Sequence, residues 1–199
     1  MSDEVTGAYG ARAESYHRLL GTAEGASPAE KDLITRWART VEGSIIDAGS
    51  GSGRWTHILH QMGLEVMGID ITPELVGIAR REYPDVTFIE GSMDTLPVPD
   101  GALGGILAWY SLIHTPPEQM PDVLAEFHRA LRPGGSILLG YIDGTEVTTV
   151  EHPIAPTWSW SAAEMTNLLD DEGFRIIHSQ HRQDAGTWPQ ATVIAIKKQ

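Results

Sequence analysis

The residues with the clearest chemical potential lie in one stretch, residues 44–59, which reads SIIDAGSGSGRWTHIL. A short apolar run ends in Asp47, glycines then alternate with small residues, and a helical pattern begins. Gly49, Gly51 and Gly53 let the backbone approach a ligand closely, and the start of a helix carries a partial positive charge that favours an anion. The stretch therefore predicts a ligand-binding turn between a strand and a helix.

The spacing of this turn fits a dinucleotide poorly. The dinucleotide pattern G-x-G-x-x-G needs a third small residue where this chain has Arg54, and Gly53 falls one place too early. Asp47 would also repel a pyrophosphate, whereas it would attract an amino group. Arg54 and the helix start would suit a carboxylate. An ammonium beside a carboxylate describes the amino-acid end of a ligand.

A second acid extends this prediction to a nucleoside. Asp70 ends the next apolar segment, LEVMGIDI, and an acid at the end of a second strand can accept hydrogen bonds from both ribose hydroxyls. Its neighbour Ile71 would lie against the face of an adenine. The turn and the two acids together predict a ligand in which an amino acid is joined to a nucleoside.

The elements that must position these residues alternate along the chain. Strands are expected at residues 44–49, 64–71, 85–90, 104–113, 136–143, 174–182 and 191–198, and helices at 8–20, 27–40, 54–63, 72–84, 116–131 and 161–173. Capping boxes are expected at Ser27 and Ser161 and a cap at Thr72, whereas residues 144–160 show no period. This order predicts a mostly parallel sheet with helices on both faces, an antiparallel C-terminal hairpin, and a ligand beyond the carboxyl ends of the strands.

Composition limits the classes of function. The chain has 199 residues and 41% hydrophobic residues, which fits one domain or one domain with a small cap. With a net charge of −13 it would repel a phosphate backbone, so we expect no nucleic-acid partner. The absence of cysteine excludes disulfides and thiolate chemistry. We find neither a membrane-length apolar run nor a secretory signal, and we therefore expect no membrane association and a cytoplasmic protein.

Several motifs together resemble the class I S-adenosylmethionine-dependent methyltransferases of the small-molecule type. DAGSGSG looks like the first motif of that family, GIDIT like the second, and EGSMDTLPVPDGALGGILAWYSLIH like its third-strand loop and fourth strand. ALRPGGSILL and SAAEMTNLLDDEGF are similar to the turn into its fifth strand and to its last helix. The resemblance implies a seven-stranded, doubly wound Rossmann-like sheet with strand order 3-2-1-4-5-7-6. It also implies an N-terminal helical cover, residues 1–43, over a methyltransferase domain, residues 44–199, in one compact unit.

The resemblance also implies roles for single residues. The methionine end of S-adenosylmethionine would be held by Asp47, the turn glycines and the carbonyl of Trp109, the ribose by Asp70, and the adenine by Ile71 and the Met93 backbone. Many members have an aspartate where this chain has Ser92, so either Ser92 or Asp94 would accept from the adenine amino group. Tyr9 or Tyr16 would close over the cofactor.

Methyl transfer to a hydroxyl usually needs a general base, and His114 is the candidate because it follows the fourth strand and histidine titrates near neutral pH. The alternative is a loop histidine that only forms hydrogen bonds. His57 and His60 share a helix face without a third ligand, so we expect no metal site. The acceptor pocket is expected to be lined by the N-terminal segment, residues 109–115 and residues 144–160. These segments are poor in charge, which favours a small, partly apolar metabolite methylated on O or N. The sequence leaves open the acceptor itself and a monomer or homodimer.

Two other classes of protein remain possible on this architecture. A nicotinamide-dependent reductase is disfavoured by Arg54 and by the absence of a Tyr-x-x-x-Lys pair at Tyr83 or Tyr141. A homologue that binds the cofactor without catalysing transfer would keep the same turn and the same acids, so the motifs do not exclude it.

Overall fold

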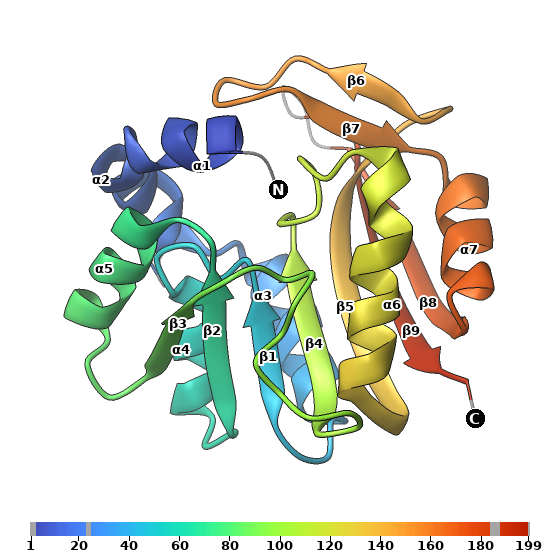
Figure 1. Cartoon of the computed structure of the whole chain (residues 1–199), viewed down its shortest axis with the longest axis horizontal. Coiled ribbons are helices and arrows are strands. Elements are labelled where there is room, and N and C mark those ends of the chain that lie inside the picture. The colour runs from blue at the N-terminus through green and yellow to red at the C-terminus, as the bar shows by residue number, and fades with distance from the viewer. Residues whose placement is uncertain (1–2, 23–24, 184–187, 199) are drawn as a thin grey trace.

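A computed structural model describes residues 3–22, 25–183 and 188–198, which form one twisted sheet with helices on both faces (Figure 1). The strands are β1 (Ile45–Ala48), β2 (Val66–Asp70), β3 (Thr87–Glu90), β4 (Leu103–Trp109), β5 (Leu131–Asp143), β6 (Thr148–Val150), β7 (Thr157–Trp160), β8 (Phe174–Arg182) and β9 (Gln190–Lys197). The longer helices are α1 (Asp3–Gly10), α3 (Pro28–Ala38), α4 (Arg54–Gln61), α5 (Pro73–Glu82), α6 (Met120–Ala130) and α7 (Ala162–Asp171).

The order of the strands follows the predicted topology. Strands β3, β2, β1, β4 and β5 are parallel neighbours in that order. The last strand, β9, pairs antiparallel with both β5 and β8, so the C-terminal hairpin enters the sheet beside β5. The doubly wound fold and its antiparallel hairpin are therefore confirmed. The turn predicted within residues 183–190 falls partly on residues 184–187, which lie outside the described residues.

Residues 144–160 differ from the expected irregular loop. They contain β6 and β7, which pair antiparallel, and β7 continues the sheet by pairing with Ile142 and Asp143 at the end of β5. The described sheet thus has nine strands rather than seven. The local signal was the β-branched and aromatic composition of TTV and TWSW, which favours strands but is too short to show a period.

The N-terminal helix expected at residues 8–20 is broken. Helix α1 ends at Gly10, the short helix α2 spans Ala13–Tyr16, and a π-helical turn, η1, spans His17–Gly21. The chain passes so close to α5 at Gly10 that a Cβ there would lie 2.6 Å from the Oε2 of Glu74. A larger residue at position 10 would therefore have to displace the side chain of Glu74.

The capping predictions are confirmed at two helices and in part at a third. Ser27 and Ser161 both form complete capping boxes with the glutamates three residues on. Thr72 is the N-cap residue of α5, as predicted, but its side chain makes no capping hydrogen bond, because both its N–H and its hydroxyl act on the carboxylate of Asp70. The fourth strand also ends at Trp109 rather than at residue 113, because Tyr110 takes a left-handed φ of 55°.

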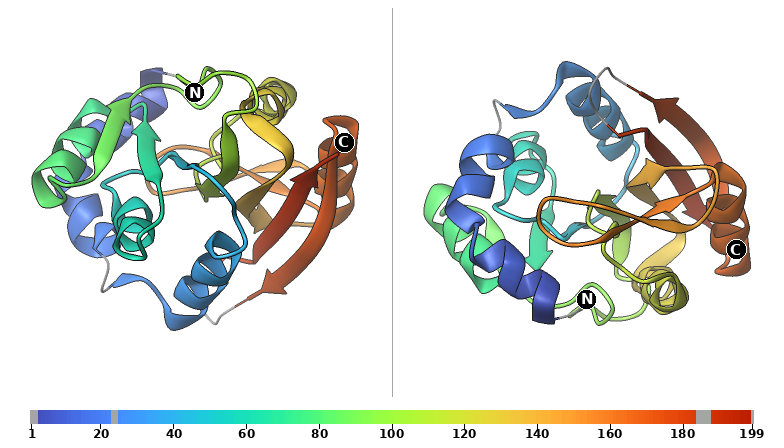
Figure 2. Two further views of the ribbon diagram at one scale, coloured as in Figure 1. Left: turned by 90° about the horizontal axis from the view of Figure 1, so that it is seen from below. Right: turned by 90° about the horizontal axis from the view of Figure 1, so that it is seen from above.

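Alternating side chains of the central strands build a core on each face of the sheet. Ile45, Leu107 and Leu138 pack with the apolar faces of α3 and α4. Their neighbours Ile46 and Ile106 point to the other face and pack against residues of α6 and α7. With both faces covered, the polar groups of the backbone are reachable mainly at the ends of the strands. Figure 2 shows, from above, the N-terminal helices and the β6–β7 hairpin lying over the carboxyl ends of the central strands.

The start of β4 offers a test of this packing. A Cβ added to Gly104 would overlap the backbone carbonyl oxygen of Glu42, which cannot rotate away. We expect Gly104→Ala to lower the free energy of unfolding by about 1–3 kcal/mol, as overpacking does in other cores. The same change at Gly77 in α5, where a Cβ meets nothing within 4 Å, should instead stabilise by about 0.5–1 kcal/mol. Urea unfolding measures both, and equal stabilities of the two variants would contradict the prediction.

Candidate functional site

A cavity opens at the carboxyl ends of β1, β2 and β4. It is lined by residues of the glycine turn, the end of β2, the start of α5, the segment after β4 and the N-terminal cover: Gly49, Gly51, Asp70, Thr72, Leu75, Trp109, Tyr110, Ser111, His114, Tyr9 and Tyr16. We call it the main cavity. It lies where the topology of a doubly wound sheet places ligands.

The glycine turn forms one wall of the main cavity with bare backbone. Gly49 and Gly51 have φ angles of 77° and 56°, which favour glycine. The ring of Tyr16 lies over Gly51, with Cε1 3.5 Å from the place a Cβ would take. A Cβ at Gly49 would overlap Ser111 and lie 3.3 Å from the Cε of Met93. The turn therefore leaves its backbone open to a ligand and allows the opposite wall to come close.

Asp70 is fixed by two backbone amides. Gly51 N–H donates to Oδ2 and Thr72 N–H donates to Oδ1, both at 2.8 Å. The carboxylate is only 9% exposed, and burial raises its pKa while the two amides and the hydroxyl of Thr72 act in the opposite direction. A carboxylate offers about four lone-pair positions, so acceptor capacity remains for a ligand. Asp70 is thus a preorganised acceptor in the wall of the main cavity.

Asp47 is not among the residues that line the main cavity. It is 1% exposed, and its Oδ2 accepts a hydrogen bond of 2.7 Å from the hydroxyl of Thr56 in α4. Burial raises its pKa from 3.8 to about 6, although the Thr56 hydroxyl lowers it in part. Asp47 therefore supports the turn from within the protein, and its predicted contact with an amino group stays a prediction.

The segment after β4 carries polar atoms without partners. Trp109 Nε1 and Ser111 Oγ are buried and have no hydrogen-bond partner among the described residues. Tyr110 between them is turned by its positive φ. Buried polar atoms of this kind are costly and gather at sites where a ligand or water completes them.

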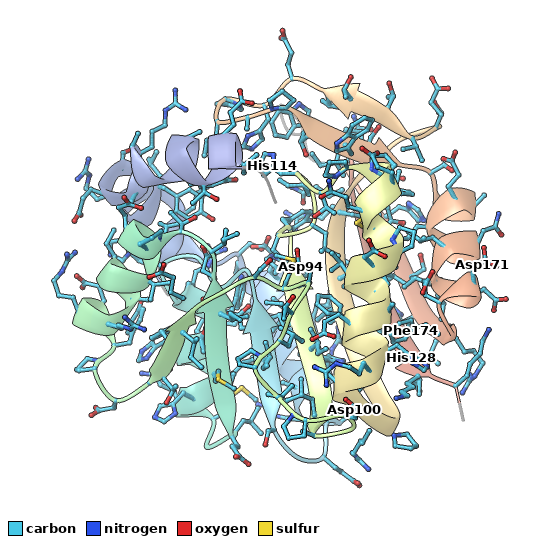
Figure 3. All side chains as sticks on the ribbon, viewed as in Figure 1. Asp94, Asp100, His114, His128, Asp171 and Phe174 are labelled. Carbon is cyan, nitrogen blue, oxygen red and sulfur yellow. The ribbon has the colours of Figure 1, made fainter. Side chains whose placement is uncertain are left out.

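His114 is buried and held from both sides. Its Nδ1 lies 2.9 Å from the carbonyl oxygen of Pro156, so Nδ1 carries the proton, and Nε2 lies 2.9 Å from the hydroxyl of Tyr9. In the neutral ring Nε2 accepts from Tyr9. Burial lowers the pKa of His114, whose ring also meets that of His152 edge-on. Figure 3 shows His114 near α1 and the β6–β7 hairpin, so the histidine joins three distant segments.

The residues predicted to hold an adenine lie beside the main cavity. Ser92, Met93 and Asp94 line a neighbouring cavity with Thr115 and Gln119. Met93 connects this cavity with the main one, because its Cε lies 3.3 Å from the position of a Cβ at Gly49. Ser92 and Asp94 both face this space, so the choice between them stays open. We call it the loop cavity.

Two further predicted residues lie outside the main and loop cavities. Ile71, half-buried, lines neither of them. The guanidinium of Arg54 lies over the ring of Trp55, 4.8 Å from its centroid. His57 stacks on Tyr83, and the described residues contain no group of three or more side chains suited to a metal ion.

Sequence reasoning placed Tyr110 and Ser111 in the predicted rim at residues 109–115, but it missed two lining residues, Thr72 and Leu75. Thr72 directly follows the predicted site residues Asp70 and Ile71, and Leu75 lies in the first turn of the next helix. That proximity was the available signal. Nothing in the sequence indicated the positive φ of Tyr110, or that Ser111 would lie where a Cβ at Gly49 would be.

The residues present fit S-adenosylmethionine. Asp70 keeps free lone pairs suited to two vicinal hydroxyls, the turn offers a cradle that a Cβ would fill, and Ser111 Oγ is unpaired. A doubly wound sheet with a glycine turn after β1 and an acid at the end of β2 defines the nucleotide-cofactor class of α/β proteins.

Comparisons with known proteins narrow this class. Residues 45–135 match the family described as "Methyltransferase domain". An uncharacterised methyltransferase of Synechocystis is 26% identical over 142 residues, covering 67% of each chain. The demethylmenaquinone methyltransferase of Chlorobaculum tepidum is 33% identical over 95 residues, covering 47% of this chain and 38% of the enzyme, so this match spans well under two thirds of that relative.

A solved structure shares the fold over nearly the whole chain. The 1,6-didemethyltoxoflavin-N1-methyltransferase of Burkholderia thailandensis superposes with a TM-score of 0.77, covering 97% of this chain and 88% of that one at 20% identity. The chain therefore carries a methyltransferase domain at residues 45–135, and the sequence matches support a class I S-adenosylmethionine-dependent methyltransferase.

The buried carboxyl of Asp47 predicts a pH dependence of stability. Its folded pKa of about 6 exceeds the ordinary value of 3.8, so the folded protein retains a proton that the unfolded chain has released. The contribution of the protonated Asp47 to the free energy of unfolding is complete below pH 4 and is lost as the pH rises through 6. Between pH 5 and 7.5 the wild type should lose about 1 kcal/mol that Asp47→Asn does not lose. Urea unfolding at both pH values measures the difference.

Asp85→Asn is the matched control, because Asp85 is exposed. It should follow the wild-type pH dependence. Parallel curves for the wild type and Asp47→Asn would show that Asp47 is not protonated near pH 5.

Proposed function

We propose that the protein transfers a methyl group from S-adenosylmethionine to an oxygen or nitrogen of a small, partly apolar metabolite. The observation that carries the proposal is the carboxylate of Asp70, held by Gly51 and Thr72 with its remaining lone pairs available. The 1,6-didemethyltoxoflavin-N1-methyltransferase is a relative in fold whose structure contains a small heterocycle and S-adenosylhomocysteine. That relative supports a small-molecule acceptor and this cofactor.

Different residues would bind different parts of S-adenosylmethionine. Asp70 would accept from the ribose hydroxyls, the backbone of Gly49 and Gly51 would flank the methionine end, and Met93 with Ser92 or Asp94 would meet the adenine from the loop cavity. S-adenosylmethionine supplies a methyl group on a sulfonium, and the acceptor atom gains this methyl as the methyl–sulfur bond breaks. The protein then mainly aligns the reactants and excludes water. Tyr16 over Gly51 and Tyr9 beside His114 would provide the exclusion.

We propose further that His114 acts as a base through Tyr9. Because Nε2 already accepts from the Tyr9 hydroxyl, a direct transfer would require this bond to break. In a relay, the acceptor's proton passes to the oxygen of Tyr9 while the proton of Tyr9 passes to Nε2. The Nδ1–H stays on the carbonyl of Pro156, which stabilises the imidazolium that forms. The lowered pKa keeps His114 neutral and ready to accept at pH 7.

The setting of the protein is also a proposal. The net charge of −13 supports a small molecule rather than a nucleic acid as partner. Across the described part of the chain, no helix combines the length and the apolar character that crossing a bilayer requires. We propose a cytoplasmic monomer or homodimer without membrane association.

Cofactor binding is tested at Asp70. Calorimetry should show binding of S-adenosylmethionine and S-adenosylhomocysteine and no binding of nicotinamide dinucleotides. Asp70→Ala removes two charge-assisted hydrogen bonds, so affinity for S-adenosylhomocysteine should fall about ten-fold or more. The exposed Asp85→Ala should bind like the wild type. Tighter binding of a dinucleotide would replace the proposal with a reductase, and turnover absent across a broad acceptor panel would indicate a non-catalytic homologue.

The relay is tested with two variants. His114→Gln and Tyr9→Phe should each lower turnover by about 10²–10⁴-fold with cofactor affinity nearly intact, the usual scale for a general base. The wild-type rate should rise with pH through a midpoint below 6.5, since burial lowers the pKa of His114, and the ring titration followed by NMR should show the same midpoint.

His60→Gln, an exposed histidine, is the matched control and should leave turnover unchanged. If Tyr9→Phe keeps full turnover while His114→Gln loses it, His114 acts directly. If both variants keep turnover and the pH limb, the pair has only a structural role.

A further inference from the structure

A second cavity lies next to the main one. It opens to solvent between the start of α3, the end of β4 and the β8–β9 hairpin. Trp109 and Tyr110 line both this space and the main cavity, so they form the partition between the two. We call it the side cavity. Nothing in the proposed cofactor site uses it.

The floor of the side cavity is a row of paired residues on three strands. Gly140 of β5 pairs with Thr192 of β9, which pairs with Gln180 of β8. Because Gly140 has no side chain, the ring of Tyr110 lies against it, with carbons 3.1–3.2 Å from the position of a Cβ. Ile194, two residues along on the same face, packs in the apolar core under α3. The face therefore changes from apolar to polar where the cavity begins.

The polar atoms of this floor are not satisfied within the protein. Thr192 is 8% exposed, and its Oγ1 has no partner among the described residues. Trp109 Nε1, from the partition, is also buried and unpaired. A buried hydroxyl and a buried N–H without partners each cost stability. A valine at position 192 would fill the same space without that cost. The hydroxyl of Thr192 is therefore suited to a hydrogen bond with a ligand.

Two side chains of opposite charge line the side cavity. Glu30 of α3 and Arg182 of β8 both line it, and both lie close enough to Tyr110 to act on its pKa, in opposite directions. Gln180 and Gln190 add amide groups that both donate and accept. Aromatic walls favour a flat ligand. The lining thus suits an uncharged ring with several donors and acceptors.

We propose that the side cavity binds the polar, non-reacting part of the methyl acceptor, a neutral planar heterocycle that carries amide-type carbonyl and N–H groups. The proposal rests on the proposed methyl transfer, because the reacting atom would extend past Trp109 and Tyr110 into the main cavity. It assigns a place to the polar part of the small, partly apolar acceptor of the proposed function. Thr192 becomes a residue that determines specificity.

The test uses two probes of equal size in the presence of S-adenosylhomocysteine. Lumazine is a neutral bicyclic ring with an imide, and quinoxaline has the same ring size without it. Calorimetry should show lumazine binding at least about ten-fold more tightly. Thr192→Val should weaken lumazine about three- to ten-fold and leave quinoxaline unchanged, whereas Thr192→Ser, which keeps the hydroxyl, should bind like the wild type.

Thr166→Val makes the same chemical change on the exposed face of α7 and should alter nothing. Unchanged affinity of the Thr192→Val variant for S-adenosylhomocysteine shows that it is folded and that the effect belongs to the side cavity. Equal binding of the two probes, no lumazine binding, or no effect of Thr192→Val would overturn this inference while cofactor binding still stands. Loss of S-adenosylhomocysteine binding by the wild type would instead overturn the proposed function.

Discussion

The carboxylate of Asp70 and the two backbone amides that hold it are the interaction on which the site depends. Gly51 belongs to the turn after β1 and Thr72 to the start of α5, so a single side chain ties two loops that face each other across the carboxyl ends of the strands. The two bonds offset part of the cost of burying a carboxylate. They also aim the remaining lone pairs of Asp70 before any ligand arrives.

The cover over this site is assembled from segments distant in sequence. Tyr16 packs on the turn at Gly51, and Tyr9 bonds to His114, which in turn bonds to the carbonyl of Pro156 in the β6–β7 hairpin. The N-terminal helices rest on α5 through Ala13, with Leu75 and Ile78. Enclosure of a ligand therefore depends on contacts that link the first residues of the chain to its last third. Division of the chain into a cover at 1–43 and a domain at 44–199 stays a prediction.

Three buried polar atoms without hydrogen-bond partners among the described residues lie at the main or the side cavity: Trp109 Nε1, Ser111 Oγ and Thr192 Oγ1. Ser50 Oγ and Trp55 Nε1 also have no such partner, and their residues line neither cavity. The apolar cores on the two faces of the sheet supply the stability that tolerates the cost of such atoms. The fold itself does not require unpaired polar atoms at the two cavities. Departures from good packing of this kind are typical of functional sites.

The sequence by itself determined the fold class, because the alternation of strands and helices is a local pattern. The glycines after Asp47 and the acid that ends β2 likewise predict where a cofactor would bind. The capping boxes at Ser27 and Ser161 could also be predicted, because they need only residues three apart. Only the tertiary structure decided that Asp47 turns inward to Thr56, that His114 is engaged by Tyr9, and that Thr192 stands beside Gly140 and Gln180. Each of these depends on residues separated by many positions in the chain and on the register of neighbouring strands, which local periodicity does not encode.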